Sequence, residues 1–135
     1  MKNSNVLPDT CIWIEYFRKQ DSIYGNYLEV LIAEDKVYTC GIIISELLSG
    51  ANSDRESKLI EYTMEALNIV DISLSTYVNA GKCRKKLLTK GKTIPLTDII
   101  LAETCITNDI PLLTFDKHFA EIQKVSSLKI INNIS

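Results

Sequence analysis

The sequence predicts a three-layer α/β/α domain with a mostly parallel central sheet. Short apolar segments alternate with longer amphipathic ones along the chain, which is the pattern of βα units around a parallel sheet. The 135 residues suit one domain and are enough to bury a sizeable core. Hydrophobic residues make up 46% of the chain and charged residues 24%, an ordinary globular balance. We therefore expect residues 1–135 to form a single domain.

The first half of the chain contains three predicted strands, each a short apolar run. They are Asn5–Pro8, Lys36–Cys40 and Leu67–Asp71. Its predicted helices carry apolar residues at helical spacing. They are Cys11–Phe17, Ile23–Ala33, Ile42–Leu48 and Asn52–Ala66. Pro8 removes one strand hydrogen bond and indicates that the first strand ends there. Gly50 follows Ser49 and is typical of the end of a helix.

The second half continues the alternation with longer helices. Its predicted helices are Ser73–Lys90, Thr97–Thr107 and Lys117–Val125. Ser73 is a suitable N-cap for the longest of them, and Gly91 a suitable C-terminal stop. The remaining strands, Ile110–Thr114 and Leu128–Ile131, are apolar runs that we expect to lie in the core.

The charge balance argues against a simple electrostatic nucleic-acid binder. The net charge is −2, from 15 basic and 17 acidic residues, whereas such binders usually carry a basic excess. A cation bound in an acidic pocket would reverse the sign locally. Six basic residues nevertheless fall within eleven positions: Lys82, Arg84, Lys85, Lys86, Lys90 and Lys92. Two interpretations of this cluster stay open, a solvated helix face and a contact to an RNA backbone.

The cysteines give no indication of a zinc site or of a redox centre. They are Cys11, Cys40, Cys83 and Cys105. They lie in apolar contexts without Cys-x-x-Cys spacing, so we expect reduced cysteines in the core. No apolar run approaches the ~20 residues that span a bilayer. The polar start, Met1–Asn5, lacks the apolar region of a signal peptide, so we expect a cytoplasmic protein without membrane contact.

Four acidic residues are candidates for a functional site. Asp9 and Asp116 each follow a predicted strand, and the carboxyl ends of neighbouring parallel strands meet in one crevice. Asp98 lies at a helix start, just beyond Pro95. Glu46 lies in an otherwise apolar helix. If the two strands are neighbours, the carboxylates of Asp9 and Asp116 enter the same crevice, and an acid in so apolar a helix as that of Glu46 lies either at its solvent edge or at a functional position.

Each acid also has a structural explanation. Asp9, Asp98 and Asp116 would each be suitable at a helix N-terminus, and Glu46 would be suitable at the surface. Taken together, however, several carboxylates in one crevice repel one another unless a cation lies among them. Oxygen ligands of this kind suit Mg²⁺ or Mn²⁺. Two such ions ~4 Å apart can activate a water and stabilise the leaving oxygen of a phosphodiester.

Two threonines stand beside these acids in the sequence. Thr10 follows Asp9, and Thr114 ends the strand that precedes Asp116. Their hydroxyls are candidate supporting groups for water or phosphate. Local hydrogen bonding to the backbone explains them equally well.

In this order, the residues resemble the PIN-domain nuclease family, and most closely the VapC toxins of bacterial toxin–antitoxin pairs. The matching segments are Val6–Thr10, Ile44–Gly50, Pro95–Ala102 and Leu113–Phe119. Together they span nearly the whole chain. The resemblance implies a PIN-like α/β fold, Mg²⁺- or Mn²⁺-dependent cleavage of RNA, a homodimer, and inhibition by a cognate VapB-like antitoxin.

The resemblance also implies a role for each acid. Asp9 and Asp98 would be the principal metal ligands, Asp116 would hold a second metal or a bridging water, and Glu46 would orient the attacking water. Hydrolysis would leave a 5′-phosphate and a 3′-hydroxyl. Glu103 and Thr104 depart from the family, whose members more often have small apolar residues there. At five positions beyond Asp98, Glu103 points away from the face that carries the acid, so we expect it at the solvated surface.

Three other functions would also place acids in an α/β fold. A haloacid-dehalogenase-type phosphatase needs an acid two positions after Asp9, where this chain has Cys11. A receiver domain would use Asp71 as its phospho-acceptor, but it also needs a lysine at a late strand end, and Lys117 instead follows an acid. A non-catalytic PIN-fold binding module would keep the fold without needing all four acids. RNA degradation with manganese, with and without EDTA, separates the module from the nuclease.

Overall fold

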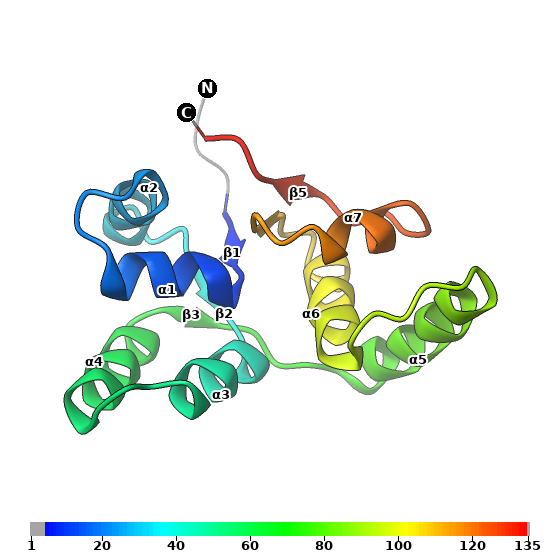
Figure 1. The fold of residues 1–135 in the computed structure, drawn as a ribbon, viewed down its shortest axis with the longest axis horizontal. Coiled ribbons are helices and arrows are strands. Elements are labelled where there is room, and N and C mark those ends of the chain that lie inside the picture. The colour runs from blue at the N-terminus through cyan, green and yellow to red at the C-terminus, as the bar shows by residue number, and fades with distance from the viewer. Residues whose placement is uncertain (1–4, 135) are drawn as a thin grey trace.

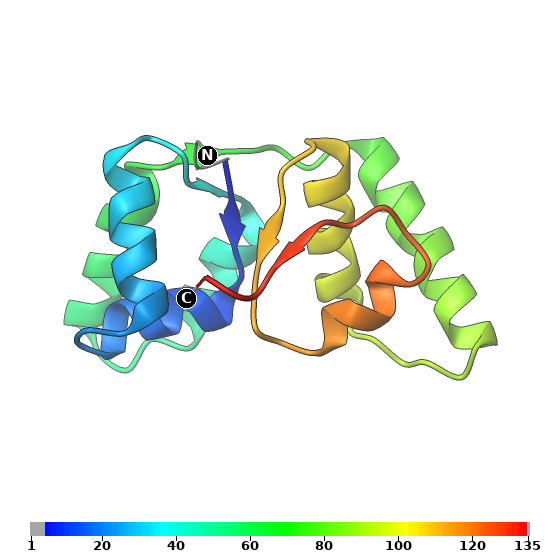
Figure 2. The same ribbon diagram turned by 90° about the horizontal axis from the view of Figure 1, so that it is seen from above.

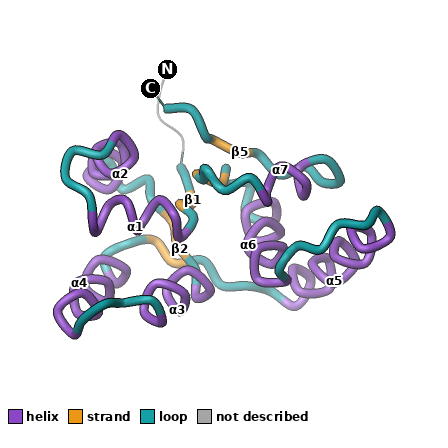
Figure 3. Tube along the Cα trace, in the orientation of Figure 1, coloured by secondary structure: helices purple, strands orange, loops and turns teal. Residues whose placement is uncertain are grey.

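The computed structural model describes residues 5–134, so most of the polar N-terminal stretch lies outside the described residues. The strands in the described part are β1 (Leu7–Pro8), β2 (Tyr38–Thr39), β3 (Asn68–Ile69), β4 (Leu112–Leu113) and β5 (Ile130–Ile131). The helices there are α1 (Thr10–Arg18), α2 (Ile23–Ala33), α3 (Gly41–Ser49), α4 (Asp54–Glu65), α5 (Leu74–Thr89), α6 (Leu96–Thr107) and α7 (His118–Gln123). Every predicted element is present, and the strands are shorter than predicted (Figure 3).

The strands run parallel and have the order β3-β2-β1-β4-β5. Strand β1 pairs with β4, β4 with β5, and β2 with β3. A single bridge between Val6 and Val37 joins the two groups of strands. Because strand order reverses between β1 and β4, the crevice at their carboxyl ends is the expected place for a ligand. The predicted parallel α/β architecture is therefore confirmed.

Pro8 explains why β1 and β2 share so short a ladder. The amide of Val6 donates to the carbonyl of Lys36, and the amide of Tyr38 donates to the carbonyl of Val6. Two residues further along β1, Pro8 has no N–H with which to continue the ladder. Towards β4 the pairing goes on, because the amide of Asp9 donates to the carbonyl of Leu113 at 2.9 Å. Asp9 is thus held at the end of β1 by the neighbouring strand.

Helices cover both faces of the strands. Helices α1 to α4 lie on one side of the strands, and α5, α6 and α7 lie on the other (Figure 1). The largest fully buried side chains include Trp13 of α1 and Phe119 of α7, which come from opposite layers. In the view from above, β1 and β4 lie side by side, and α1 and α7 begin beyond their carboxyl ends (Figure 2). The fold therefore brings the starts of two helices to one edge of the sheet.

Helix α5 lies within its predicted range, Ser73–Lys90, with Ser73 as the N-cap and Lys90 as the C-cap. The side chain of Ser73 accepts a hydrogen bond from the amide of Thr76, as an N-cap should. Beyond the C-cap, Gly91 has a φ of +73°, a left-handed conformation that glycine adopts without a Cβ clash. Within the described residues, no helix is both long and apolar enough to cross a membrane.

The prediction for Glu103 is wrong, because its side chain is buried and only 9% exposed. As predicted, Glu103 lies on a face of α6 that points away from Asp98. This face is covered by α5, however, and is not open to water. Glu103 lines a hollow with Lys82, Cys83 and Lys86 of α5. Burial raises the pKa of its carboxyl.

The cysteines and the basic cluster agree largely with expectation. Cys40, Cys83 and Cys105 are free and buried, whereas Cys11 is half-buried beside Asp9. Most of the basic cluster is exposed on α5 or just beyond it, as a solvated helix face would be. Its contact with RNA stays a prediction.

Candidate active site

Asp9 is a buried carboxylate that does not cap the helix it precedes. It occupies the N-cap position of α1, but its side chain makes no capping hydrogen bond. Instead, its Oδ2 accepts a 3.0 Å hydrogen bond from the hydroxyl of Thr114. The Sγ of Cys11 lies 3.6 Å from the same oxygen. Burial raises the pKa of Asp9, and the charge of Asp116 raises it further. The hydrogen bonds to the carboxylate lower the pKa.

Glu46 reaches the same site from α3. Its Oε1 accepts a 3.1 Å hydrogen bond from the hydroxyl of Thr10, which is the first residue of α1. Burial raises the pKa of Glu46, and the nearby charge of Asp9 raises it further. Each of the two threonines therefore orients one acid, and local backbone bonding is not the main role of Thr10.

Burial, and then the charges of the other three candidate acids, raise the pKa of Asp98. This residue lies in the first turn of α6, and it is half-buried. Burial raises its pKa to about 6, and the charges of Asp9, Asp116 and Glu46 contribute in that order. A residue that served only to charge a helix terminus would not meet three other carboxylates. The structure thus brings together all four acids that the sequence singled out.

Asp116 combines a place in this group with a local structural role. Its amide donates to the hydroxyl of Thr114 at 3.0 Å, and its Oδ1 accepts from the amide of His118 at 3.0 Å. The second bond holds the start of α7, as the sequence allowed for this residue. The first bond makes Thr114 the link between Asp9 and Asp116.

His118 also lies at this site, although it is not among the residues predicted from the sequence. Its Nδ1 lies 3.6 Å from Oδ2 of Asp98 and 3.6 Å from Oδ1 of Asp116. One potential ligand atom from each of these three residues lies within 4.8 Å of the other two. The signal that would have found His118 is its spacing, since a residue two positions after Asp116 at a helix start can turn back towards it.

The donor set suits a hard divalent cation. Carboxylate oxygens predominate, with one imidazole nitrogen beside them, and Mg²⁺ or Mn²⁺ prefers such ligands. Burial is the largest cause of the raised pKa of Asp98, and the charges of the other carboxylates raise it further, because these groups repel one another when no cation balances them. The site therefore fits the metal that the sequence implied.

A family model for the PIN domain matches residues 6–125. The chain belongs to the PIN domain family. Over 131 residues this PIN domain is 25% identical to Ribonuclease VapC1 of Methanocaldococcus jannaschii, with 96% of the chain and 88% of that protein covered. It is also 27% identical over 128 residues to Ribonuclease VapC11 of Mycobacterium tuberculosis, with 92% of the chain and 96% of that protein covered.

Solved structures with the same fold as the PIN domain include chains of VapBC2 and FitAcB. The PIN domain superposes with a TM-score of 0.77 on a chain of VapBC2 from Rickettsia felis, solved bound to a DNA fragment from their promoter. The identity is 22%, and 96% of this chain and 98% of that chain are covered. For FitAcB from Neisseria gonorrhoeae the TM-score is 0.73, at 22% identity, with coverages of 94% and 96%. At such identities the likeness establishes the fold.

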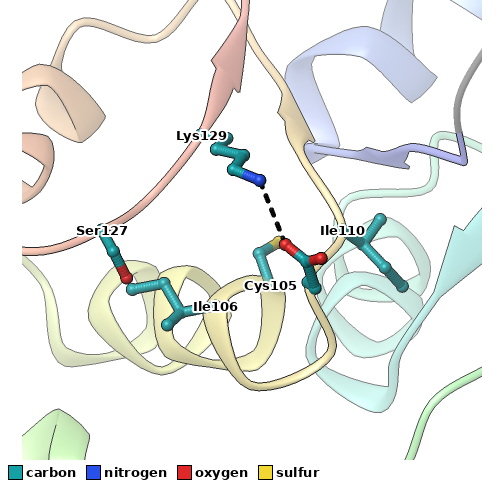
Figure 4. Close-up of a pocket in the computed structure, with 6 residues that line it drawn as sticks. Cys105, Ile106, Ile110, Ser127 and Lys129 are labelled. Atoms are coloured by element: carbon teal, nitrogen blue, oxygen red, sulfur yellow. Dashed lines mark hydrogen bonds and ion pairs between the residues drawn. The ribbon is translucent and has the colours of Figure 1, made fainter.

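A hollow at the opposite end of the PIN domain offers no comparable chemistry. It lies at the amino ends of β4 and β5, and Cys105, Ile110 and Lys129 are among its lining residues (Figure 4). Lys129 is paired with Asp109 at 3.2 Å. The pKa of the Cys105 thiol is strongly raised by burial, so this sulfur stays protonated and unreactive.

Proposed function

We propose that this chain is a single nuclease domain, a metal-dependent endoribonuclease, and the toxin of a VapBC-type toxin–antitoxin pair. One observation carries the nuclease assignment: four carboxylates converge at the switch point of the sheet, and three of them raise the pKa of the fourth, Asp98. The names of the relatives, both ribonucleases, support RNA as the substrate.

Asp9, Asp98 and Asp116 are the residues that would hold Mg²⁺ or Mn²⁺. Ligand atoms of Asp98 and Asp116 lie within 4.8 Å of each other and of one from His118, and the charge of Asp9 acts on Asp98. A divalent ion bound there supplies positive charge at the phosphate and makes water more acidic. The buried environment of Asp9 favours charge neutralisation by a cation, because an isolated buried carboxylate is unfavourable.

Glu46 is suited to accept the proton of the attacking water. Burial raises its pKa towards neutrality, and a general base works best when its pKa is near the working pH. Thr10 holds one oxygen of Glu46, which leaves the other carboxylate oxygen available. Attack of water on phosphorus breaks the bond between phosphorus and the 3′ oxygen. One product then carries a 5′-phosphate and the other a 3′-hydroxyl.

The rival functions have less support. In the receiver hypothesis Asp71 would be phosphorylated, but Asp71 is exposed beyond β3 and is not among the charges that act on Asp98. A non-catalytic binding module gives no reason for a group of mutually repelling acids. Each pair of carboxylates in such a module would only destabilise the fold.

The deciding experiment is RNA cleavage by the purified protein. We expect degradation of single-stranded RNA with Mn²⁺, and none when EDTA removes the metal. Products should carry 5′-phosphates, which a 5′-phosphate-dependent exonuclease reveals. Verified folded protein that leaves RNA intact in Mn²⁺ would contradict the nuclease assignment and favour the binding module.

We further propose a homodimer and a VapB-like antitoxin as partners. The structural neighbours include toxin–antitoxin complexes, which supports the second partner. Light scattering of the purified protein tests the dimer, and co-purification with a small protein encoded beside this chain tests the antitoxin.

A further inference from the structure

A hollow of about 300 Å³ adjoins the acidic site on the side of β5. Thr114 and Asp116, which belong to the acidic site, are among its lining residues. Its other lining residues include Phe115, Lys117 and Asn132. A ligand that occupies the hollow would therefore lie beside Asp116, at the edge of the acidic site.

Phe115 presents an aromatic ring at this hollow. It is 44% exposed, although Thr114 before it is buried. The ring packs on Tyr24 of α2, with 5.2 Å between ring centroids. The hydroxyl of Tyr24 donates to the carbonyl of Asn132 at 3.0 Å, so one tyrosine supports both sides of the hollow. Because Tyr24 packs against one side of the ring, its exposed side is a suitable surface on which a nucleobase can stack.

Polar groups around the ring match the rest of a nucleotide. Lys117 is exposed and makes no ion pair among residues 5–134, so its charge is available to a phosphate. The side-chain amide of Asn132 likewise has no hydrogen-bond partner in that part of the chain. Amides of this kind read the edges of unstacked bases. A cation here matters because the neighbouring acids otherwise repel RNA.

We propose that this hollow is a nucleotide subsite of the nuclease. A base of single-stranded RNA stacks on Phe115, its edge faces Asn132, and its phosphate contacts Lys117. The inference rests on the proposed ribonuclease function. It adds to that function a site, formed by Phe115 and Asn132, that selects the nucleotide beside the cleaved bond. Tyr24 is a positioning residue in this site.

The first test is the kinetics of Phe115 variants on short single-stranded RNA with Mn²⁺. Loss of one base stack in Phe115→Ala should raise KM by about 5- to 150-fold and change kcat little. Phe115→Leu keeps an apolar side chain on Tyr24 but has no ring, so it should show the raised KM and a wild-type melting temperature. Phe115→Trp should restore the low KM. The matched control is Tyr62→Ala, which removes an exposed aromatic side chain on α4.

The second test is the salt dependence of RNA binding in Lys117→Gln. Removal of one phosphate contact should lower the slope of log affinity against log salt by about 0.7. Lys58→Gln removes a lysine of α4 that is also exposed, and it should leave the slope unchanged.

The outcomes separate this subsite from the proposed function. Wild-type protein that cleaves no RNA overturns both. An active enzyme in which Phe115→Leu keeps the wild-type KM and cleavage pattern overturns the subsite alone. If Phe115→Leu keeps the wild-type KM but no longer binds the small protein encoded beside this chain, the hollow binds a protein partner. This result also overturns the subsite.

Discussion

The hydroxyl of Thr114 donates a 3.0 Å hydrogen bond to Oδ2 of Asp9, across 105 residues of sequence. The bond joins the carboxyl ends of β1 and β4, the strands between which the order of the sheet reverses. It also acts against the burial that raises the pKa of Asp9. A short polar contact thus helps to keep a buried acid in the charged form that a cation needs.

Thr114→Val should therefore impair the enzyme without unfolding it. Valine has a similar shape but cannot donate to Asp9 or accept from the amide of Asp116. The pKa of Asp9 should rise further, and cleavage of RNA at neutral pH should fall about 10- to 100-fold, as for other residues that orient metal ligands. Thr114→Ser keeps the hydroxyl and should retain most of the activity. Equal rates in the valine and serine variants would contradict this role.

Asp9→Asn and Asp98→Asn should each abolish Mn²⁺-dependent cleavage of RNA while leaving the fold intact. Each change removes a charge that would hold the metal, at almost constant volume. Glu103→Gln is the matched control, because it makes the same chemical change on α6 at a residue that faces α5. It should be nearly neutral for cleavage. Substantial activity in Asp9→Asn, with contaminating nucleases excluded, would show that the site is misplaced.

Local signals predicted much of this structure. Ser73 and Gly91 mark the ends of α5, because a side-chain cap and a left-handed glycine depend on only a few neighbouring residues. Asp9 and Asp116 were found because each follows an apolar run, and parallel strands bring their carboxyl ends together. The convergence of Glu46 could be inferred only from the family resemblance, since its contact with Thr10 spans 36 residues.

Tertiary packing accounts for what the sequence did not reveal. Helical periodicity places Glu103 on the face away from Asp98, but it does not say whether another helix covers that face. Here α5 does, and the carboxyl is buried. His118 was overlooked because its position beside Asp98 depends on how α6 and α7 pack, which no local pattern reports.

Expression of the chain alone should arrest bacterial growth, if it is the toxin of a pair. A small protein encoded beside it should restore growth, and it would use arginine or lysine at the acidic site because a cation can pair with carboxylates. Asp98→Asn, expressed to the same soluble level, should permit normal growth. Normal growth with soluble wild-type protein would argue against the toxin assignment and leave the PIN fold unaffected.

Without metal, the protein should lose stability as the pH rises from about 4 to about 6. The pKa of Asp98 is raised from its ordinary 3.8 to about 6 in the folded state. Between these values the folded protein binds more protons than the unfolded chain, so a rise in pH favours unfolding. The loss should be roughly 1–2 kcal/mol, since Asp98 is only partly buried. Melting curves in EDTA measure it, and Asp98→Asn should show a flatter dependence on pH.

Metal binding should reverse this loss, and the reversal separates a metal site from a set of helix caps. An ion that binds only the folded state stabilises it by about 2.7 kcal/mol at a hundredfold excess over Kd. For a domain of this size the melting temperature should rise by roughly 5–12 °C. At neutral pH in EDTA, Asp98→Asn should melt no lower than the wild type, because it removes part of the repulsion among the acids.

In Asp98→Asn the rise with Mn²⁺ should be largely absent. A helix cap predicts the opposite pattern, since asparagine caps about as well as aspartate and metal should then shift neither protein. Four melting curves decide the matter: wild type and Asp98→Asn, each in EDTA and in Mn²⁺. Equal shifts in the two proteins, or no shift in the wild type, would exclude Asp98 as a metal ligand. The ion would then have to be held by other residues, or the repulsion around Asp98 relieved by a proton.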